Sequence, residues 1–176
     1  MEVIGRTVDD AAGEAFDKIA KYMNLGYPGG PVIEKLALRA PGRGVLFPKI
    51  LPEPGDTRFS YSGIKTAVIN YLKANPDADP AGVVHGFQER VLEILVRRAF
   101  AAARERGIRS LVVAGGVAAN GRLRRMLNDE ARAGEEVIIA SPLLCTDNAA
   151  MVAGIGYRYY ASGRTAGLDA DVHARA

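Results

Sequence analysis

The pattern of apolar and polar positions predicts one long helix in the middle of the chain. Between residues 80 and 106, apolar residues recur every three or four positions, the spacing of a helix with one buried face. Asp79 and Pro80 favour the start of this helix, and Gly107 favours its end. A helix of about 27 residues, at about 1.5 Å per residue, spans about 40 Å, the width of a small lobe. Its predicted core positions are Val84, Phe87, Val91, Leu95 and Ala99.

A first, shorter helix is predicted near the N-terminal end. Asp9 or Asp10 suits its N-cap, and the helical pattern continues to about Asn24. Asp10 and Asp17 lie two turns apart on its polar side. They either reach one ligand together or belong to a solvated acidic face. The predicted inward positions are Phe16, Ile19, Ala20 and Met23.

The segment that follows, Tyr27–Pro31, is rich in proline and glycine. Pro28 and Gly29 suit the two central positions of a type II turn. Pro31 suits the first position of a second helix, Val32–Ala40. The glycines either leave room for a ligand next to free N–H groups or connect two helices, and the sequence does not decide between these interpretations.

A β-hairpin and a third helix are predicted before the long helix. The hairpin consists of residues 44–50 and 58–61, joined by a Pro-rich loop at 51–56, and the helix runs from residue 62 or 63 to 73. In the hairpin, the expected cross-strand apolar residues are Val45 and Phe47 on one strand and Phe59 and Tyr61 on the other.

After the long helix, the pattern changes to a strand, a glycine turn and a helix. Leu111–Ala114 is predicted to be a buried strand, Gly115 and Gly116 the turn, and a helix opens near Asn120. Such a turn either brings backbone N–H groups close to a phosphate or ribose, or is a plain connection. No GxGxxG or Walker pattern is present to strengthen the first interpretation.

A second strand and a last helix complete the chain. The strand is expected at Glu136–Ala140 and the helix at Ala149–Tyr160, with Thr146 or Asp147 as its N-cap. Because strands alternate with helices here, the chain is assigned to the α/β class.

Composition and charge add little to this picture. The chain has 176 residues, 48% of them hydrophobic, and a net charge of +3, which does not by itself indicate a nucleic-acid binder. Nine arginines between Arg97 and Arg132 form either an RNA-facing surface or solvated helix faces. Cys145 is the single cysteine, and no signal peptide or long apolar run is found, so we expect a cytoplasmic protein without a membrane segment.

Five motifs, in order, carry a resemblance to a known family. They are GEAFDK at 13–18, GYPGGP at 26–31, FSYSGIKTA at 59–67, VVAGGVAAN at 112–120 and CTDNAAM at 145–151. Together they resemble the bacterial tRNA N6-adenosine threonylcarbamoyltransferases, formerly called O-sialoglycoprotein endopeptidases. The resemblance implies the actin-like ATPase (ASKHA) fold of sugar kinases, heat-shock chaperones and actin. Residues 1–161 would form its C-terminal lobe, with the N-terminal lobe missing, and residues 162–176 a loosely ordered tail.

The resemblance also implies site residues. Asp17, Gly30 and Asn120 match contacts to the adenylate-type substrate, threonylcarbamoyl-AMP, and the Gly115–Gly116 turn would hold its nucleotide end. Glu34 stands where many relatives carry an aspartate, which keeps the charge on a longer arm. No residue stands out as a general base.

Asp147 matches a ligand of the single metal ion of the family, Fe2+. The other ligands in the family are two histidines in an H-x-x-x-H pattern, whereas this chain has only His85 and His173, far apart. We therefore expect an incomplete metal site, and a fragment that is inactive alone.

The activity implied is transfer of a threonylcarbamoyl group to N6 of a tRNA adenosine. The implied partners are tRNA, threonylcarbamoyl-AMP or another adenine nucleotide, a paralogous partner subunit and a small ATPase. One alternative is a non-catalytic nucleotide-binding or partner-docking remnant of the same fold. Another is a sugar-kinase-like ATPase lobe, which does not explain CTDN and YPGGP together. Neither a nucleophile paired with a base nor a zinc-protease pattern supports a protease.

Overall fold

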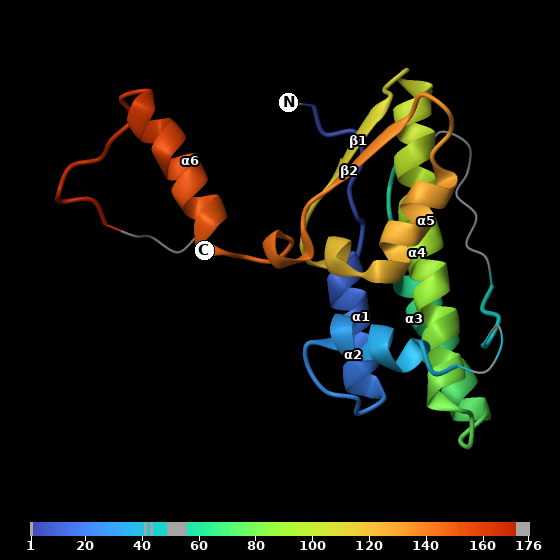
Figure 1. The fold of residues 1–176 in the computed structure, drawn as a ribbon. Coiled ribbons are helices and arrows are strands. Elements are labelled where there is room, and N and C mark those ends of the chain that lie inside the picture. Colours follow the sequence, from blue (N-terminus) through green and yellow to red (C-terminus); the bar gives the residue numbers. More distant parts are fainter. Residues whose placement is uncertain (1, 41, 43, 49–55, 172–176) are drawn as a thin grey trace.

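Helix α4 (Pro80–Glu105) is the helix against which most of the other described helices pack (Figure 1). The structure is a computed structural model that describes residues 2–40, 42, 44–48 and 56–171. The Asp79 carboxylate caps α4 by accepting hydrogen bonds from the N–H groups of Ala81 and Gly82 at 3.2 and 3.1 Å, so the predicted start is confirmed. Its fully buried side chains are Val83, Val84, Phe87, Val91 and Leu92.

Helix α1 (Ala12–Tyr22) packs against α2 (Gly29–Ala37) and α3 (Ser62–Ala74). It begins later than predicted, because neither Asp9 nor Asp10 is its N-cap. Asp9 accepts hydrogen bonds from Ser60 Oγ and from the first N–H groups of α3, while Asp10 is buried and paired with two lysines, Lys18 and Lys65. Both aspartates therefore join separate segments of the chain.

Helix α2 begins at Gly29 and not at Val32 as predicted. The residue before it, Pro28, has extended backbone angles and is the N-cap, and Gly29 is the first helical residue. The predicted type II turn with Pro28 and Gly29 at its centre is therefore wrong. Asp17 Oδ1 accepts a hydrogen bond from the Gly29 N–H at 2.7 Å, which satisfies a free donor at the new helix start.

The predicted hairpin between 44–50 and 58–61 is also wrong in its pairing. Phe59 forms a parallel bridge with Thr7, supported by a hydrogen bond from the Phe59 N–H to Arg6 O at 3.0 Å. The segment with Val45 instead lies against α4, where a Cβ on Gly86 would come within 1.8 Å of the Val45 carbonyl oxygen. Only glycine permits this approach. The predicted loop lies outside the described residues except for Asp56.

A small parallel sheet confirms the α/β class. Strands β1 (Ser110–Val113) and β2 (Glu136–Ile139) pair with Val112 opposite Ile138. The chain between them forms a short 3-10 helix, η1 (Gly116–Ala119), and α5 (Gly121–Glu130), which packs on α4. The strand predicted to be buried is only partly buried: Leu111 and Val113 are half-buried, and Val112 and its partner Ile138 are 70% and 47% exposed.

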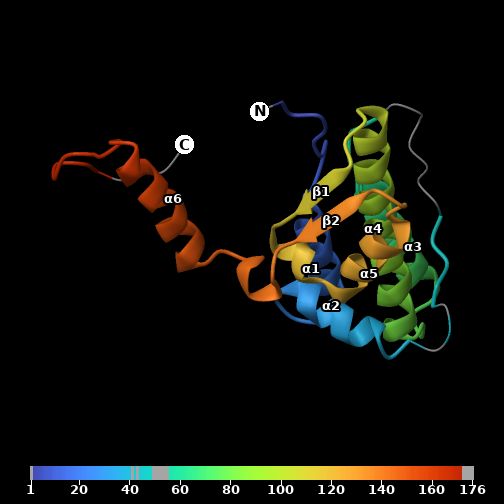
Figure 2. The ribbon, with the colours of Figure 1, turned by 45° about the horizontal axis from the view of Figure 1, so that its top comes forward.

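The last elements extend away from the other helices in both views (Figures 1 and 2). A 3-10 turn, η2 (Pro142–Leu144), leads to α6 (Ala149–Ala161), in which no residue is buried. The N-cap of α6 is Asn148, whose Oδ1 accepts from the Met151 N–H at 3.0 Å, and not Thr146 or Asp147 as predicted. Among the described residues, no helix is both long and apolar enough to span a bilayer.

Candidate nucleotide site

The residues that the motifs singled out lie where α1, α2 and the start of α5 meet. Asp17, on α1, is half-buried, and its carboxylate accepts from the Gly29 N–H at 2.7 Å. Gly30 follows directly, and a Cβ built on it has no heavy atom within 4 Å. The first turn of α2 is thus held against α1 on one side and open at Gly30.

Glu34 connects the same helix to α5. It lies one turn after Gly30, and its Oε1 accepts from the Gly121 N–H at 2.7 Å. Gly121 is the first residue of α5, so this carboxylate occupies the position at a helix N-terminus that favours negative charge. The Glu34 side chain thus joins α2 to the start of α5.

Asn120 is the N-cap of α5 and is 7% exposed. Its Oδ1 accepts from the Leu123 N–H and its Nδ2 donates to Gln88 Oε1, both at 2.9 Å. Its own N–H donates to Val117 O in the turn at 3.0 Å. The side chain is therefore used largely inside the protein, although the sequence suggested an amide offered to a ligand.

Gly115 and Gly116 form the open side of this turn. Gly115 has a φ of 92°, a conformation that favours glycine, and a Cβ on either residue would meet no heavy atom within 4 Å. A ligand can approach the backbone closely here, as the sequence suggested.

The structure thus brings together the implied contacts as one continuous edge. This edge runs from Asp17 through Gly30 and Glu34 to Asn120 and the Gly115–Gly116 turn. The hydrogen bonds from the Gly29 N–H to Asp17 and from the Gly121 N–H to Glu34 connect its parts. A hollow of about 560 Å³ adjoins it, lined by Asp17, Lys18, Lys21, Asn24, Gly26 and Tyr27. Carboxylates that accept hydrogen bonds beside bare glycine backbone suit the hydroxyl groups of a ribose.

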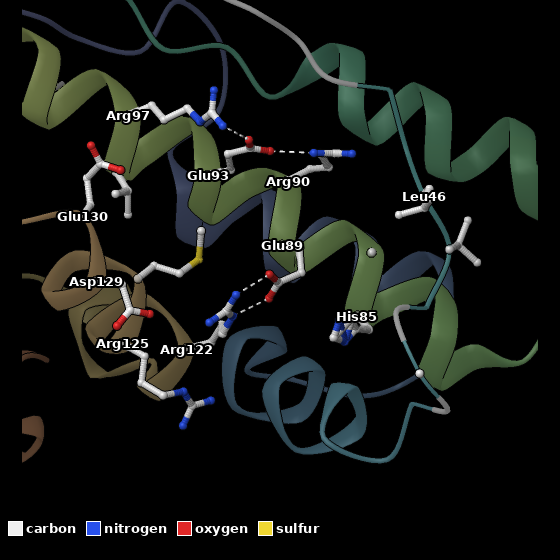
Figure 3. Close-up of a pocket in the computed structure, with 15 residues that line it drawn as sticks. Leu46, His85, Glu89, Arg90, Glu93, Arg97, Arg122, Arg125, Asp129 and Glu130 are labelled. Atoms are coloured by element: carbon white, nitrogen blue, oxygen red, sulfur yellow. Dashed lines mark hydrogen bonds and ion pairs between the residues drawn. The ribbon is translucent and has the colours of Figure 1, made fainter.

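A second groove, of about 770 Å³, lies between α4 and α5 and was not anticipated (Figure 3). Arg122 makes a bidentate pair with Glu89, with both N–O distances 2.7 Å, and these hydrogen bonds, which Arg122 donates to the Glu89 carboxylate, raise the pKa of Arg122. Arg90 and Arg97 both pair with Glu93. Four arginines and four carboxylates line the groove, so its charges balance, which favours solvated, paired helix faces over an RNA-facing surface.

Comparison with known proteins identifies the family. The sequence model described as tRNA N6-adenosine threonylcarbamoyltransferase matches residues 1–154. The chain belongs to this family.

Curated relatives carry the same name as this family. The chain is 49% identical over 158 residues to a tRNA N6-adenosine threonylcarbamoyltransferase from Thermotoga neapolitana, with 89% of this chain and 48% of the relative covered. It is 47% identical over 174 residues to one from Geobacter sp., with 97% and 51% covered. The chain therefore spans about half the length of the curated relatives it matches.

The fold is similar to that in a crystal structure of HypF from T. kodakarensis. The TM-score is 0.57 at 21% identity, and the similarity covers 86% of this chain and 20% of that one. At this identity the likeness concerns the fold alone.

Asp147 of this threonylcarbamoyltransferase-family chain follows η2, which contacts η1. Its side chain is exposed, in the link between η2 and α6. Within the described part of the chain, no three His, Cys, Asp or Glu residues come together as a metal site. These residues alone do not fit an iron centre.

Two contacts at the site were missed by the sequence analysis. Gln88 accepts from Asn120, and the backbone of Gly121 donates to Glu34. A polar residue within the apolar face of α4 was the one available signal for the first of these.

Proposed function

We propose that the protein transfers a threonylcarbamoyl group from threonylcarbamoyl-AMP to N6 of an adenosine in tRNA, and that this chain supplies the nucleotide-binding edge. The attacking amine forms a bond to the carbonyl carbon, the bond from that carbon to the phosphate oxygen breaks, and AMP leaves while the amine loses a proton. Membership of the family supports the reaction. No residue of the chain is assigned as the base.

The observation that carries the proposal is the continuous edge formed by the motif residues. Asp17 and Glu34 each use one carboxylate oxygen for a backbone N–H, and their second oxygens would accept from ribose hydroxyls. The open space at Gly30 and the Gly115–Gly116 turn supports a close approach of the ligand to the backbone. These residues come from segments about 100 positions apart in sequence, and a hydrogen bond between α2 and α5 holds them together.

We assign the fold as the C-terminal lobe of an ASKHA protein, residues 1–161, followed by a tail at 162–176. The small parallel sheet with crossover helix α5 and the likeness to HypF support this assignment. The nucleotide would then lie between this lobe and a second one, and half of such a cleft leaves the ligand wet and weakly bound.

Iron and protein partners enter the proposal through the family alone. Asp147 would supply one carboxylate to an Fe2+ centre whose other ligands come from outside the described residues. tRNA, a paralogous partner subunit and a small ATPase are the macromolecular partners proposed for the intact protein.

Titration calorimetry with AMP and ATP tests the nucleotide edge. We expect the chain to bind with a Kd above about 10 μM, and Asn120→Ala to bind more weakly. Asn128→Ala is the matched control, since Asn128 is an exposed residue of the same helix, two turns away. Equal binding by wild type and Asn120→Ala would move the site elsewhere, and absence of binding would refute a nucleotide site on this chain alone.

A further inference from the structure

Gln88 is a buried polar residue in the apolar interior of α4. Its side chain is 4% exposed, and Val84, Phe87, Val91 and Leu92 around it on the helix are completely buried. A carboxamide in such surroundings destabilises the fold unless it is hydrogen-bonded. The position would be filled more favourably by an apolar residue if packing were its whole purpose.

The partner of Gln88 is the cap of another helix. Gln88 Oε1 accepts from Asn120 Nδ2 at 2.9 Å, a contact between residues 32 positions apart that lies wholly within the core. Capping α5 requires only the Asn120 Oδ1, which bonds the Leu123 N–H. Asp, Ser or Thr would supply that acceptor as well. The bond to Gln88 needs a donor as well, which an aspartate lacks and which the Asn120 amide supplies on a separate atom from the acceptor.

We propose that Gln88 is a positioning residue for the candidate nucleotide site. By accepting from Nδ2, it fixes the plane of the Asn120 amide and, through Asn120, the first turn of α5. The Asn120 N–H to Val117 O bond extends this control to the glycine turn. The relevance to ligand binding rests on the proposed function, whereas the positioning of Asn120 does not.

The hydrogen-bonding capacity of Asn120 shows what this arrangement achieves. A carboxamide has two N–H donors and an oxygen with two lone pairs. Among the described residues, Gln88 takes one donor and Leu123 one lone pair. One donor and one lone pair remain, and their directions are set because both atoms of the amide are already held.

Two variants separate this role from simple packing. Gln88→Leu removes the acceptor while keeping a side chain of similar size, and Gln88→Glu keeps an acceptor oxygen whether or not the carboxyl is ionised. Val91→Ala, less than one turn further along α4, is a control that perturbs the core and leaves the Gln88–Asn120 bond in place.

The first measurement needs no ligand. By NMR we expect the Leu123 N–H and the Asn120 side-chain amide protons to exchange with solvent about fivefold faster in Gln88→Leu, from the loss of one hydrogen bond. Gln88→Glu should restore slow exchange, and Val91→Ala should not change the Asn120 signals. Unchanged Asn120 and Leu123 signals in Gln88→Leu would overturn the proposal.

The second measurement is a double-mutant cycle for AMP binding. We expect Gln88→Leu and Asn120→Ala each to weaken binding by about fivefold, and the double variant to be no weaker than Asn120→Ala alone. Effects that simply multiply would show that Gln88 acts independently of Asn120 and overturn the link to the site. If the wild type does not bind AMP, the proposed function fails, and the exchange measurement still decides the positioning.

Discussion

Gly29 and Gly30, in the first turn of α2, allow a structural role and a binding role to be tested separately. A Cβ on Gly29 would lie 2.6 Å from Phe16 O and 2.7 Å from Asp17 Cα, so α1 would have to move. A Cβ on Gly30 would meet no heavy atom within 4 Å. The substitutions Gly29→Ala and Gly30→Ala are chemically identical and one residue apart, and each is the control for the other.

The expected difference in stability is large. Forcing a methyl group into a packed contact destabilises a protein by about 1–3 kcal/mol. Alanine in an open helical position is favoured over glycine by up to about 1 kcal/mol. Both glycines are helical, so this gain is common to the two variants, which should differ by the packing cost of about 1–3 kcal/mol, or roughly 2–12 °C in Tm for a chain of this size.

Thermal unfolding followed by circular dichroism measures this difference, and AMP titration measures the other half of the prediction. We expect Gly30→Ala to fold as well as wild type and to bind AMP more weakly, because the methyl group fills the space left for the ligand. Equal destabilisation by the two substitutions would refute the packing of α2 on α1. A stable Gly30→Ala variant with unchanged affinity would remove Gly30 from the site.

Three further predictions concern other parts of the chain. Burial opposes ionisation of Asp9, but hydrogen bonds from Ser60 Oγ and the start of α3 outweigh it and lower its pKa. Its stabilising effect is therefore present above about pH 4 and lost as the pH falls through the folded pKa, so Asp9→Asn should be less stable than wild type in urea unfolding at pH 7, with a smaller gap at pH 3. Elemental analysis should find no tightly held metal in the purified chain, and a stoichiometric ion lost in Asp147→Ala would contradict this. Light scattering should show self-association through the exposed apolar residues of α6; a monomeric chain that Met151→Glu destabilises would show instead that α6 folds onto its own lobe.

The sequence predicted the elements whose signals are local. The apolar period and Asp79–Pro80 predicted the long helix α4. Its start at Pro80 is confirmed, and it ends at Glu105, one residue before the predicted end. The helix opening at Asn120 is confirmed for the same reason, since its cap lies next to the helix it caps.

The failures arose where distant segments compete for the same groups. Asp9 resembles a cap for α1, but it binds the N–H groups of Tyr61 and Ser62, more than 50 residues away. Phe59 resembles a hairpin strand, but Thr7 is its partner. The site residues came from the resemblance, while Gln88 was missed because its meaning depends on α5 packing beside it.

Three acidic side chains share a role that bears on how the chain folds. Asp9, Asp17 and Glu34 each accept from the first backbone N–H of a helix to which they do not belong, across 53, 12 and 87 residues of sequence. The ends of α2, α3 and α5 are therefore completed only when the helices have docked. An isolated peptide covering any one of them should be poorly helical in water, and secondary and tertiary structure in this region should appear in a single cooperative step.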